Sequence, residues 1–197
     1  MKRISTTFFA ISVILLVAGC KGSGKQTEET LPIIEKALSD TASVFYADFS
    51  QYPTDLRELP IGVFDSGTGG LTVLEKLLSL DTHDNITGEE SKDDIPDFAG
   101  EHFVYLADQA NMPYGVYDAC GKADYLRELV VKDALFLMDD DFYQNPYQEE
   151  AEGVKLPVKI MVIACNTATA YGLKSIQGML GRIDNGVKVI GVINAGV

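Results

Sequence analysis

From residue 61 onward, short apolar runs alternate with longer segments in which apolar residues recur at helical spacing. Four apolar runs predict β-strands, at residues 61–64, 102–108, 158–164 and 187–193. Three segments with helical periodicity lie between them, at residues 71–78, 122–138 and 166–180. This alternation predicts an α/β fold, a parallel sheet with helices on both faces.

The residues before this pattern differ in composition. Residues 31–60 hold a short helical pattern followed by an aromatic stretch, and we expect an accessory extension that packs on the domain. Residues 20–30 are polar and rich in small and charged residues, a composition typical of a flexible tether. The α/β domain itself is expected to span residues 61–197, with acidic connections at 81–100 and 139–152.

Residues 1–19 have the pattern of an export signal. Lys2 and Arg3 precede the apolar run 8–18, which is too short to span a bilayer comfortably. The run leads into "VAGC", which resembles a bacterial lipobox, and the resemblance implies that Cys20 is lipidated and becomes the first residue. We therefore expect a lipoprotein anchored on the periplasmic or extracytoplasmic side of a membrane. Lys21 favours the outer membrane if the cell has one; an ordinary signal peptide or an uncleaved anchor is the alternative.

Net charge and residue composition argue against two kinds of binding partner, nucleic acids and metal ions. The formal net charge of -13 argues against nucleic acid, because phosphates would be repelled. His83 and His102 are the only histidines, and neither they nor the cysteines have metal-site spacing. We expect no metal. With Cys20 lipidated, Cys120 and Cys165 are the remaining thiols, and in an oxidising compartment they could pair.

Polar residues follow three of the predicted strands at their carboxyl ends. Asp65 and Ser66 follow the first strand, residues 108–115 the second and residues 165–167 the third. Ligands of parallel α/β sheets bind beyond the carboxyl ends of the strands. The three segments therefore predict one shared site.

The glycine-rich turn "DSGTGG" fits no nucleotide or hydrolase motif. It lacks the third glycine of the dinucleotide fingerprint, the lysine of the phosphate loop and the first glycine of the nucleophile elbow. Its backbone amides at a helix start would suit a carboxylate or phosphate. The alternative is that Asp65 and Ser66 only cap the following helix.

Cys165 stands between a strand end and a helix start. A helix N-terminus stabilises a thiolate, which can act as a nucleophile or a general base. The alternative is a buried structural cysteine. Tyr114, in "MPYG", could bind a ligand or belong to a simple turn, and Cys120 is expected to be a packed residue.

Three segments, "IGVFDSGTGGLTVL", "VYLADQANMPYG" and "VIACNTATA", together resemble the amino-terminal motifs of bacterial glutamate racemase and the wider aspartate/glutamate racemase family. The resemblance implies that Cys165 is one of two catalytic thiols. It places Asp65 and Ser66 beside the reacting carbon, where the Asp65 carboxylate helps to tune a base. It also implies a set of residues that hold the amino acid: Ser66, Tyr114, Gly115, Asn166 and Thr167. Gln109 and Asn111 depart from the family pattern, which loosens the substrate assignment between glutamate and aspartate.

The chemistry implied by the resemblance is racemisation without a cofactor. One base removes the α-proton on one face and a second returns a proton on the other. Without pyridoxal, the pocket itself must stabilise the developing carbanion. Family members supply D-glutamate for peptidoglycan in the cytosol, so an exported member is unexpected.

The family's second thiol stands in a Cys-Thr-His motif, and no such motif occurs in these 197 residues. We therefore expect the chain to hold only the first lobe and the first thiol, and to be inactive alone. Two alternatives stay open: a single-thiol relative of the decarboxylase type, and a non-catalytic envelope lipoprotein with a racemase-like fold. Whether the chain forms a homodimer also stays open.

Overall fold

The computed structural model describes residues 30–142 and 153–193. The predicted signal peptide and Cys20 lie outside these ranges. Within them, no helix is long and apolar enough to cross a membrane.

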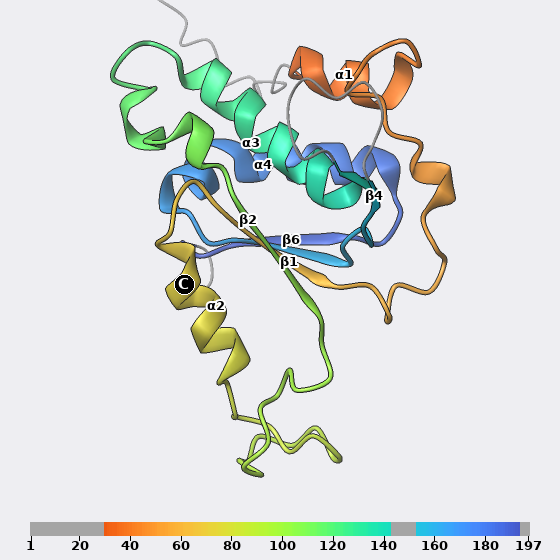
Figure 1. The fold of residues 1–197 in the computed structure, drawn as a ribbon, viewed down its shortest axis with the longest axis vertical. Helices are drawn as coiled ribbons and strands as arrows, with labels where there is room; N and C mark the ends of the chain where they lie inside the picture. Colours follow the sequence, from red (N-terminus) through yellow and green to blue (C-terminus); the bar gives the residue numbers. More distant parts are fainter. Residues whose placement is uncertain (1–29, 143–152, 194–197) are drawn as a thin grey trace, which may run out of the picture.

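A four-stranded parallel sheet forms the centre of the molecule, in the order β2-β1-β5-β6 (Figure 1). Its strands are β1 (Ile61–Asp65), β2 (Phe103–Ala107), β5 (Ile160–Ile163) and β6 (Lys188–Gly191). All five residues of β1 are buried. This burial explains why its sequence is continuously apolar until Asp65, since a central parallel strand is covered on both faces.

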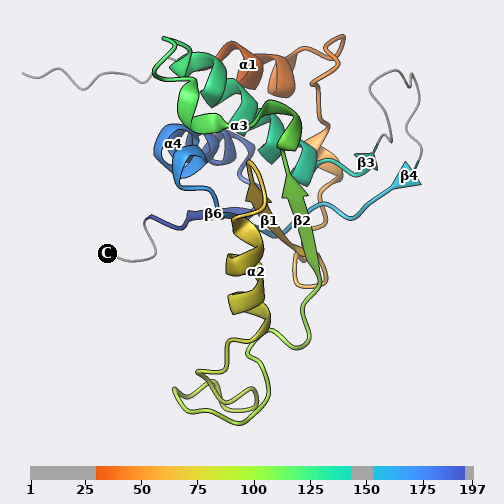
Figure 2. The same ribbon diagram turned by 60° about the vertical axis from the view of Figure 1, so that its left-hand side comes forward.

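Helices cover both faces of the sheet, as the sequence predicts. The α-helices are α1 (Pro32–Ser39), α2 (Gly70–Leu78), α3 (Ala123–Met138) and α4 (Asn166–Ile183). α1, α3 and α4 lie on one side of the sheet and α2 lies on the other (Figures 1 and 2). The expected α/β class is therefore confirmed.

The main core lies between the sheet and the α3–α4 layer. Leu126 and Val130 of α3 and Ile176 and Met179 of α4 are almost completely buried there. A second, smaller apolar cluster lies beneath α2 and includes Val63 of β1. Both clusters attach helices to the strands whose ends carry the predicted site.

The accessory residues 31–60 pack on the outer side of this layer. Ile33, Ile34 and Ala37 of α1 are buried in the same apolar cluster as α3. After the short 3-10 helix η1 (Phe49–Gln51), the Tyr52 hydroxyl donates to the Val158 carbonyl oxygen at 2.9 Å. The extension is therefore held by apolar burial and by a hydrogen bond to the segment before β5.

A two-stranded antiparallel ladder, β3 (Asp141–Phe142) with β4 (Gly153–Val154), was not expected from the sequence. The sequence predicts only an acidic connection in this region. Two-residue strands are too short to show a period of two, so pattern alone could not reveal them.

Candidate active site

The polar segments predicted from the sequence lie at one edge of the sheet. β2, β1 and β5 are neighbours and run parallel, so Asp108, Asp65 and Cys165 follow adjacent strand ends. The amide of Asp108 donates to the carbonyl oxygen of Asp65 at 2.9 Å, which extends the ladder past β2. The tertiary structure thus brings together residues that lie 100 positions apart in the sequence (65 to 165).

The side chains of Cys165 and Ser66 join two of these segments. The Ser66 Oγ lies 3.3 Å from the Cys165 Sγ, and either atom could donate the hydrogen. Cys165 is also the N-cap residue of α4, where its sulfur accepts the Ala168 amide at 3.4 Å. The sulfur therefore contacts a hydroxyl and a backbone amide at the N-terminus of α4.

Cys165 is only 8% exposed. The carbonyl oxygen of the same residue accepts the Thr169 hydroxyl at 2.9 Å, so backbone and side chain are both fixed by the first turn of α4. A thiol held in this way offers its sulfur at a defined point of the sheet edge. That geometry suits a proton-transferring base.

Asp65 is buried and holds the start of α2. Its Oδ2 accepts the Gly70 amide at 2.8 Å. A β-carbon on Gly70 would lie 2.7 Å from the Asp65 Cβ and 2.9 Å from the Ala164 Cβ, so this close approach requires glycine. The alternative interpretation, that Asp65 and Ser66 cap the following helix, is met in part: Asp65 accepts the first amide of α2, whereas the N-cap residue is Gly69 and Ser66 contacts Cys165 instead.

Asn166 and Thr167 open the first turn of α4, next to Cys165. Asn166 is exposed and Thr167 half-buried. Gly115, on the neighbouring loop after β2, is exposed. These three residues are accessible from solvent, and their role in holding an amino acid stays a prediction.

Tyr114 lies in the interior, with 1% of its surface exposed. Its hydroxyl oxygen is 2.6 Å from the Asp108 Oδ2 and 2.8 Å from the Asp133 Oδ2. In this arrangement the hydroxyl connects the loop after β2 to helix α3. Binding of substrate through this hydroxyl stays a prediction, and would require the hydroxyl to exchange one of these partners.

A phenol carries one hydrogen, so the Tyr114 hydroxyl cannot donate to two carboxylates at once. The arrangement is satisfied when one carboxyl is protonated and donates to the phenol oxygen. Burial is the main cause that raises the pKa of Asp133 to about 7, and the Asp108 charge adds to it. Burial, followed by the Asp133 charge, raises the pKa of Tyr114 above its usual range. Asp133 is thus the carboxyl best placed to hold the proton.

Asn111, one of the two departures from the family pattern, belongs to the same network. Its Nδ2 donates to the Asp108 carboxylate at 2.9 and 3.0 Å. The Asp108 carboxylate is therefore held by the Asn111 amide and the Tyr114 hydroxyl together. Asn111, which departs from the family pattern, thus fixes the carboxylate of Asp108 within the loop.

Sequence reasoning missed Asp133. A signal for it exists, because position 133 lies four residues after Leu129 and three after Val130, on the apolar face of the predicted helix. A carboxyl on a buried helix face requires a polar partner. Searching the apolar face for such a residue would have found the partner of Tyr114.

The remaining cysteine does not join the site contacts. The expectation that Cys120 is a packed residue is wrong: it is exposed in the turn before α3, where the chain reverses at the surface. Both Cys120 and Cys165 are free thiols. In residues 30–142 and 153–193, no group of three His, Cys, Asp or Glu side chains could hold a metal ion.

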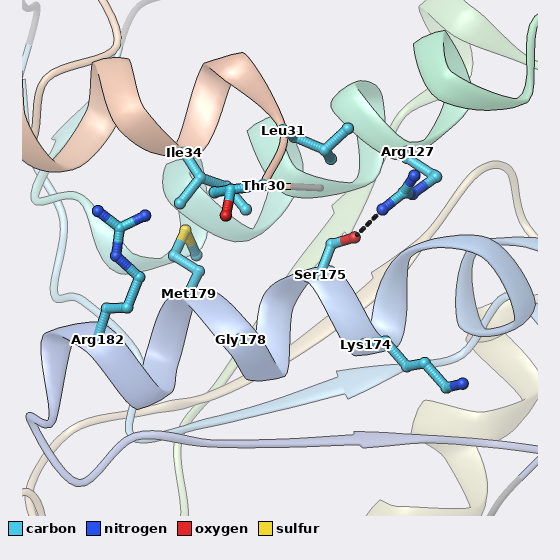
Figure 3. Close-up of a pocket in the computed structure, with 9 residues that line it drawn as sticks. All are labelled: Thr30, Leu31, Ile34, Arg127, Lys174, Ser175, Gly178, Met179 and Arg182. Atoms are coloured by element: carbon cyan, nitrogen blue, oxygen red, sulfur yellow. Dashed lines mark hydrogen bonds between the residues drawn. The ribbon is translucent and has the colours of Figure 1, made fainter. Parts of the chain in front are cut away.

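Figure 3 shows a separate hollow of about 100 Å³ between α1, α3 and α4. Inside it, Arg127 donates to the Ser175 hydroxyl at 3.2 Å beside Ile34 and Met179. None of the predicted site residues lines this hollow. It lies where the extension packs on the domain, away from the strand ends.

The chain is similar in sequence to glutamate racemases. It is 33% identical to the glutamate racemase of Lactobacillus johnsonii over 141 residues, which cover 70% of this chain and 36% of that protein. It is 32% identical to the enzyme of Campylobacter jejuni over 139 residues, 71% of this chain and 39% of that protein. The glutamate racemase of Halothermothrix orenii is 32% identical over 117 residues, 59% of this chain and 32% of that protein.

The chain spans about a third of the length of the glutamate racemases that it matches. No protein-family model matches it. The resemblance seen in the three motifs is thus supported by similarity over most of the chain. The activity, substrate and partners of the whole protein belong to the proposals that follow.

Proposed function

We propose that this chain forms one side of the active site of a cofactor-independent racemase that interconverts L- and D-glutamate. The observation that carries the proposal is the contact of Ser66 with Cys165 at the shared strand edge, in a chain similar to glutamate racemases. Cys165 is the proton-transferring thiol on one face of the substrate. Ser66 and the helix dipole stabilise its thiolate.

The substrate binds beyond the carboxyl ends of these strands. Asn166, Thr167 and Gly115 hold its carboxylates, with exposed backbone and side-chain donors. Asp65 stabilises the loop that carries Ser66 through its bond to the Gly70 amide. Aspartate is the alternative acidic substrate.

A second thiol must return the proton on the opposite face. Cys120 is exposed in the turn before α3, and we do not assign it this role. We propose that these 197 residues bind the acidic amino acid but do not racemise it by themselves. Exchange of the glutamate α-proton with deuterium from solvent, lost on Cys165→Ala, would contradict this.

Binding is tested by protection of the two thiols from alkylation. Glutamate should slow the reaction of Cys165 with iodoacetamide, measured by peptide mass spectrometry, and should leave Cys120 unchanged. Cys120 serves as the internal control because it is exposed and outside the contacts of the site. Equal alkylation of Cys165 with and without saturating glutamate and aspartate would contradict the assignment.

A single-thiol reaction is the second candidate, since Cys165 is the buried one of the two described thiols. One thiol suffices to protonate a carbanion formed by loss of carbon dioxide. Release of carbon dioxide from a malonate, abolished by Cys165→Ala, would support this candidate over racemisation.

For the cellular location, we propose that lipidated Cys20 anchors the chain to the extracytoplasmic side of a membrane. The support is the order of basic residues, apolar run and lipobox in residues 1–20. Mass spectrometry of the amino-terminal peptide from membrane-extracted protein tests this. A lipid-modified peptide beginning at Cys20 is the expected result, and an unmodified peptide beginning at Met1 would contradict it.

A further inference from the structure

A cluster of apolar side chains on the accessory extension has no covering element among the described residues. Val44, Phe45 and Tyr46 are 92%, 37% and 37% exposed, in the loop that follows α1. Phe136 of α3, also 37% exposed, lines the same shallow groove. We call these four residues the aromatic patch. Three consecutive exposed apolar residues are unusual on a water-facing loop.

Two lysines accompany the aromatic patch. The Lys132 Nζ lies 5.0 Å from the ring centre of Phe45, and the Lys155 Nζ lies 5.0 Å from the ring centre of Phe136. The Lys155 Nζ also donates to the Asp139 carbonyl oxygen, and Asp139 lines the same groove, so Lys132 is the lysine that can turn towards a headgroup. Aromatic rings with a lysine beside them match the interface between lipid headgroups and acyl chains. There the ring enters the apolar layer while the ammonium reaches the phosphates.

The position of the patch relative to the predicted anchor limits what can cover it. Thr30 lies ten positions after Cys20 and two positions before Pro32, the first residue of α1. At full extension ten residues span no more than about 35 Å. The loop carrying Val44 continues from α1, and the Ala47 amide donates back to the Ala37 carbonyl oxygen at 3.2 Å. An anchored chain therefore presents this side of the molecule within reach of the bilayer.

The charge of the molecule favours the same orientation. The chain is acidic overall, with a net charge of -13, and residues 81–100 are rich in Asp and Glu. In Figure 1 that segment lies at the end of the molecule opposite α1. An anionic bilayer repels this acidic end and attracts Lys132 beside the patch.

We propose that the aromatic patch rests in the headgroup layer of the membrane that carries the Cys20 anchor. The anchor holds the chain at the surface and the patch fixes its orientation, with residues 81–100 directed away from the lipid. A single acyl attachment leaves orientation free, and a second apolar contact restricts it. This inference relies on the proposed anchor and is independent of the racemase chemistry.

The protein contains no tryptophan, so one introduced tryptophan reports on a single position. The full chain would be prepared as Phe45→Trp and, as the matched control, as Ile86→Trp. Ile86 is 94% exposed in the segment at the opposite end. Each variant is reconstituted into vesicles of phosphatidylcholine and phosphatidylglycerol, with and without bromine on the acyl chains. The tryptophan of Phe45→Trp should be quenched at least about twofold more than that of Ile86→Trp, because a ring seated at the interface meets the bromines.

A second substitution, Val44→Asp in the Phe45→Trp background, should reduce the quenching to the level of the Ile86→Trp control. Val44 is almost fully exposed, so this change leaves the fold intact. Equal quenching at positions 45 and 86, in protein shown by mass spectrometry to carry the lipid on Cys20, would overturn the proposal. A second result would also overturn it. If, in detergent micelles, the tryptophan at position 45 became less accessible to a water-soluble quencher as the protein concentration rose, a second copy of the chain would be covering the patch. Quenching that persists in Cys20→Ser protein would support the patch and show that it binds the bilayer without the lipid.

Discussion

At the scale of single residues, the contact between Ser66 and Cys165 gives the site its chemistry. The Ser66 Oγ lies 3.3 Å from the Cys165 sulfur, and in the proposed function it donates to the thiolate. A hydrogen bond to a charged group contributes about 1.5–3 kcal/mol. The hydroxyl therefore matters more for the thiolate than for the neutral thiol.

We expect Ser66→Ala to slow alkylation of Cys165 at neutral pH by about tenfold, since each 1.4 kcal/mol lost from the thiolate corresponds to a factor of ten. The rates are measured with iodoacetamide by peptide mass spectrometry, and Cys120 in the same sample is the control. An unchanged Cys165 rate would mean that the hydroxyl does not donate to the sulfur.

Asp133 makes stability depend on pH. Its pKa is raised to about 7 in the folded state, mainly by burial, above the ordinary value of 3.8. The folded state therefore binds the proton more tightly than the unfolded state. The stabilisation is complete below pH 4 and is lost as the pH rises towards 7. The free energy of unfolding that Asp133 contributes below pH 4 and loses above pH 7 is on the order of a few kcal/mol.

We expect Asp133→Asn to remove this contribution. The original protein should lose free energy of unfolding between pH 4 and pH 8, and the variant should lose less. The difference between the two proteins should therefore grow in favour of the variant, as measured by urea denaturation at both pH values. Asn keeps a polar group that can bond the Tyr114 hydroxyl, so its packing is similar. Asp124→Asn on the exposed start of α3 is the control and should not change the pH slope. Parallel curves for Asp133→Asn and the original protein would contradict the prediction.

At the scale of elements, helix α4 connects the site to the core. Its first turn holds Cys165, and its middle packs against α3 at Gly172. A β-carbon at Gly172 would lie 2.2 Å from the Val130 Cγ1 and 2.6 Å from its Cβ. The two helices therefore approach through a position where only hydrogen fits.

Two substitutions in α4 should have opposite effects on stability. Gly172→Ala introduces a clash with Val130 and should lower the free energy of unfolding by about 1–3 kcal/mol. Gly178→Ala has open space around the new carbon and should raise it by about 0.5–1 kcal/mol, because alanine restricts the unfolded chain and favours helix. Urea denaturation measures both. The same sign for the two variants would contradict the packing described for α3 and α4.

At the scale of the whole molecule, apolar burial rather than charge holds the accessory extension. Ile34 is 3% exposed in the core cluster. Arg182 and Glu35 form a bidentate pair at 2.6 and 3.0 Å, but both side chains remain in contact with water. Exposed ion pairs contribute little because solvent screens them.

We expect Ile34→Ala to destabilise the protein by about 2–5 kcal/mol, since it leaves a cavity under α1. Glu35→Gln, the adjacent control, should leave the urea midpoint unchanged within error. If Glu35→Gln destabilised the protein as much as Ile34→Ala, the extension would depend on charge instead.

The sequence by itself determined the four strands of the main sheet and the three helices between them, because buried strands and amphipathic helices leave different apolar periods. The two-residue strands β3 and β4 are too short to leave a period. The sequence also indicated that polar residues follow three strand ends, and parallel strands place such ends on one edge. The helical pattern in residues 31–60 was visible for the same reason.

Tertiary structure alone decided which side chains meet. The contact of Ser66 with Cys165, the connection of Asp108 and Asp133 through Tyr114, and the gathering of Phe136 with residues 44–46 all join positions from separate elements. No period along the chain encodes such distances. They follow from strand order and helix packing, which bring remote residues within a few ångströms of one another.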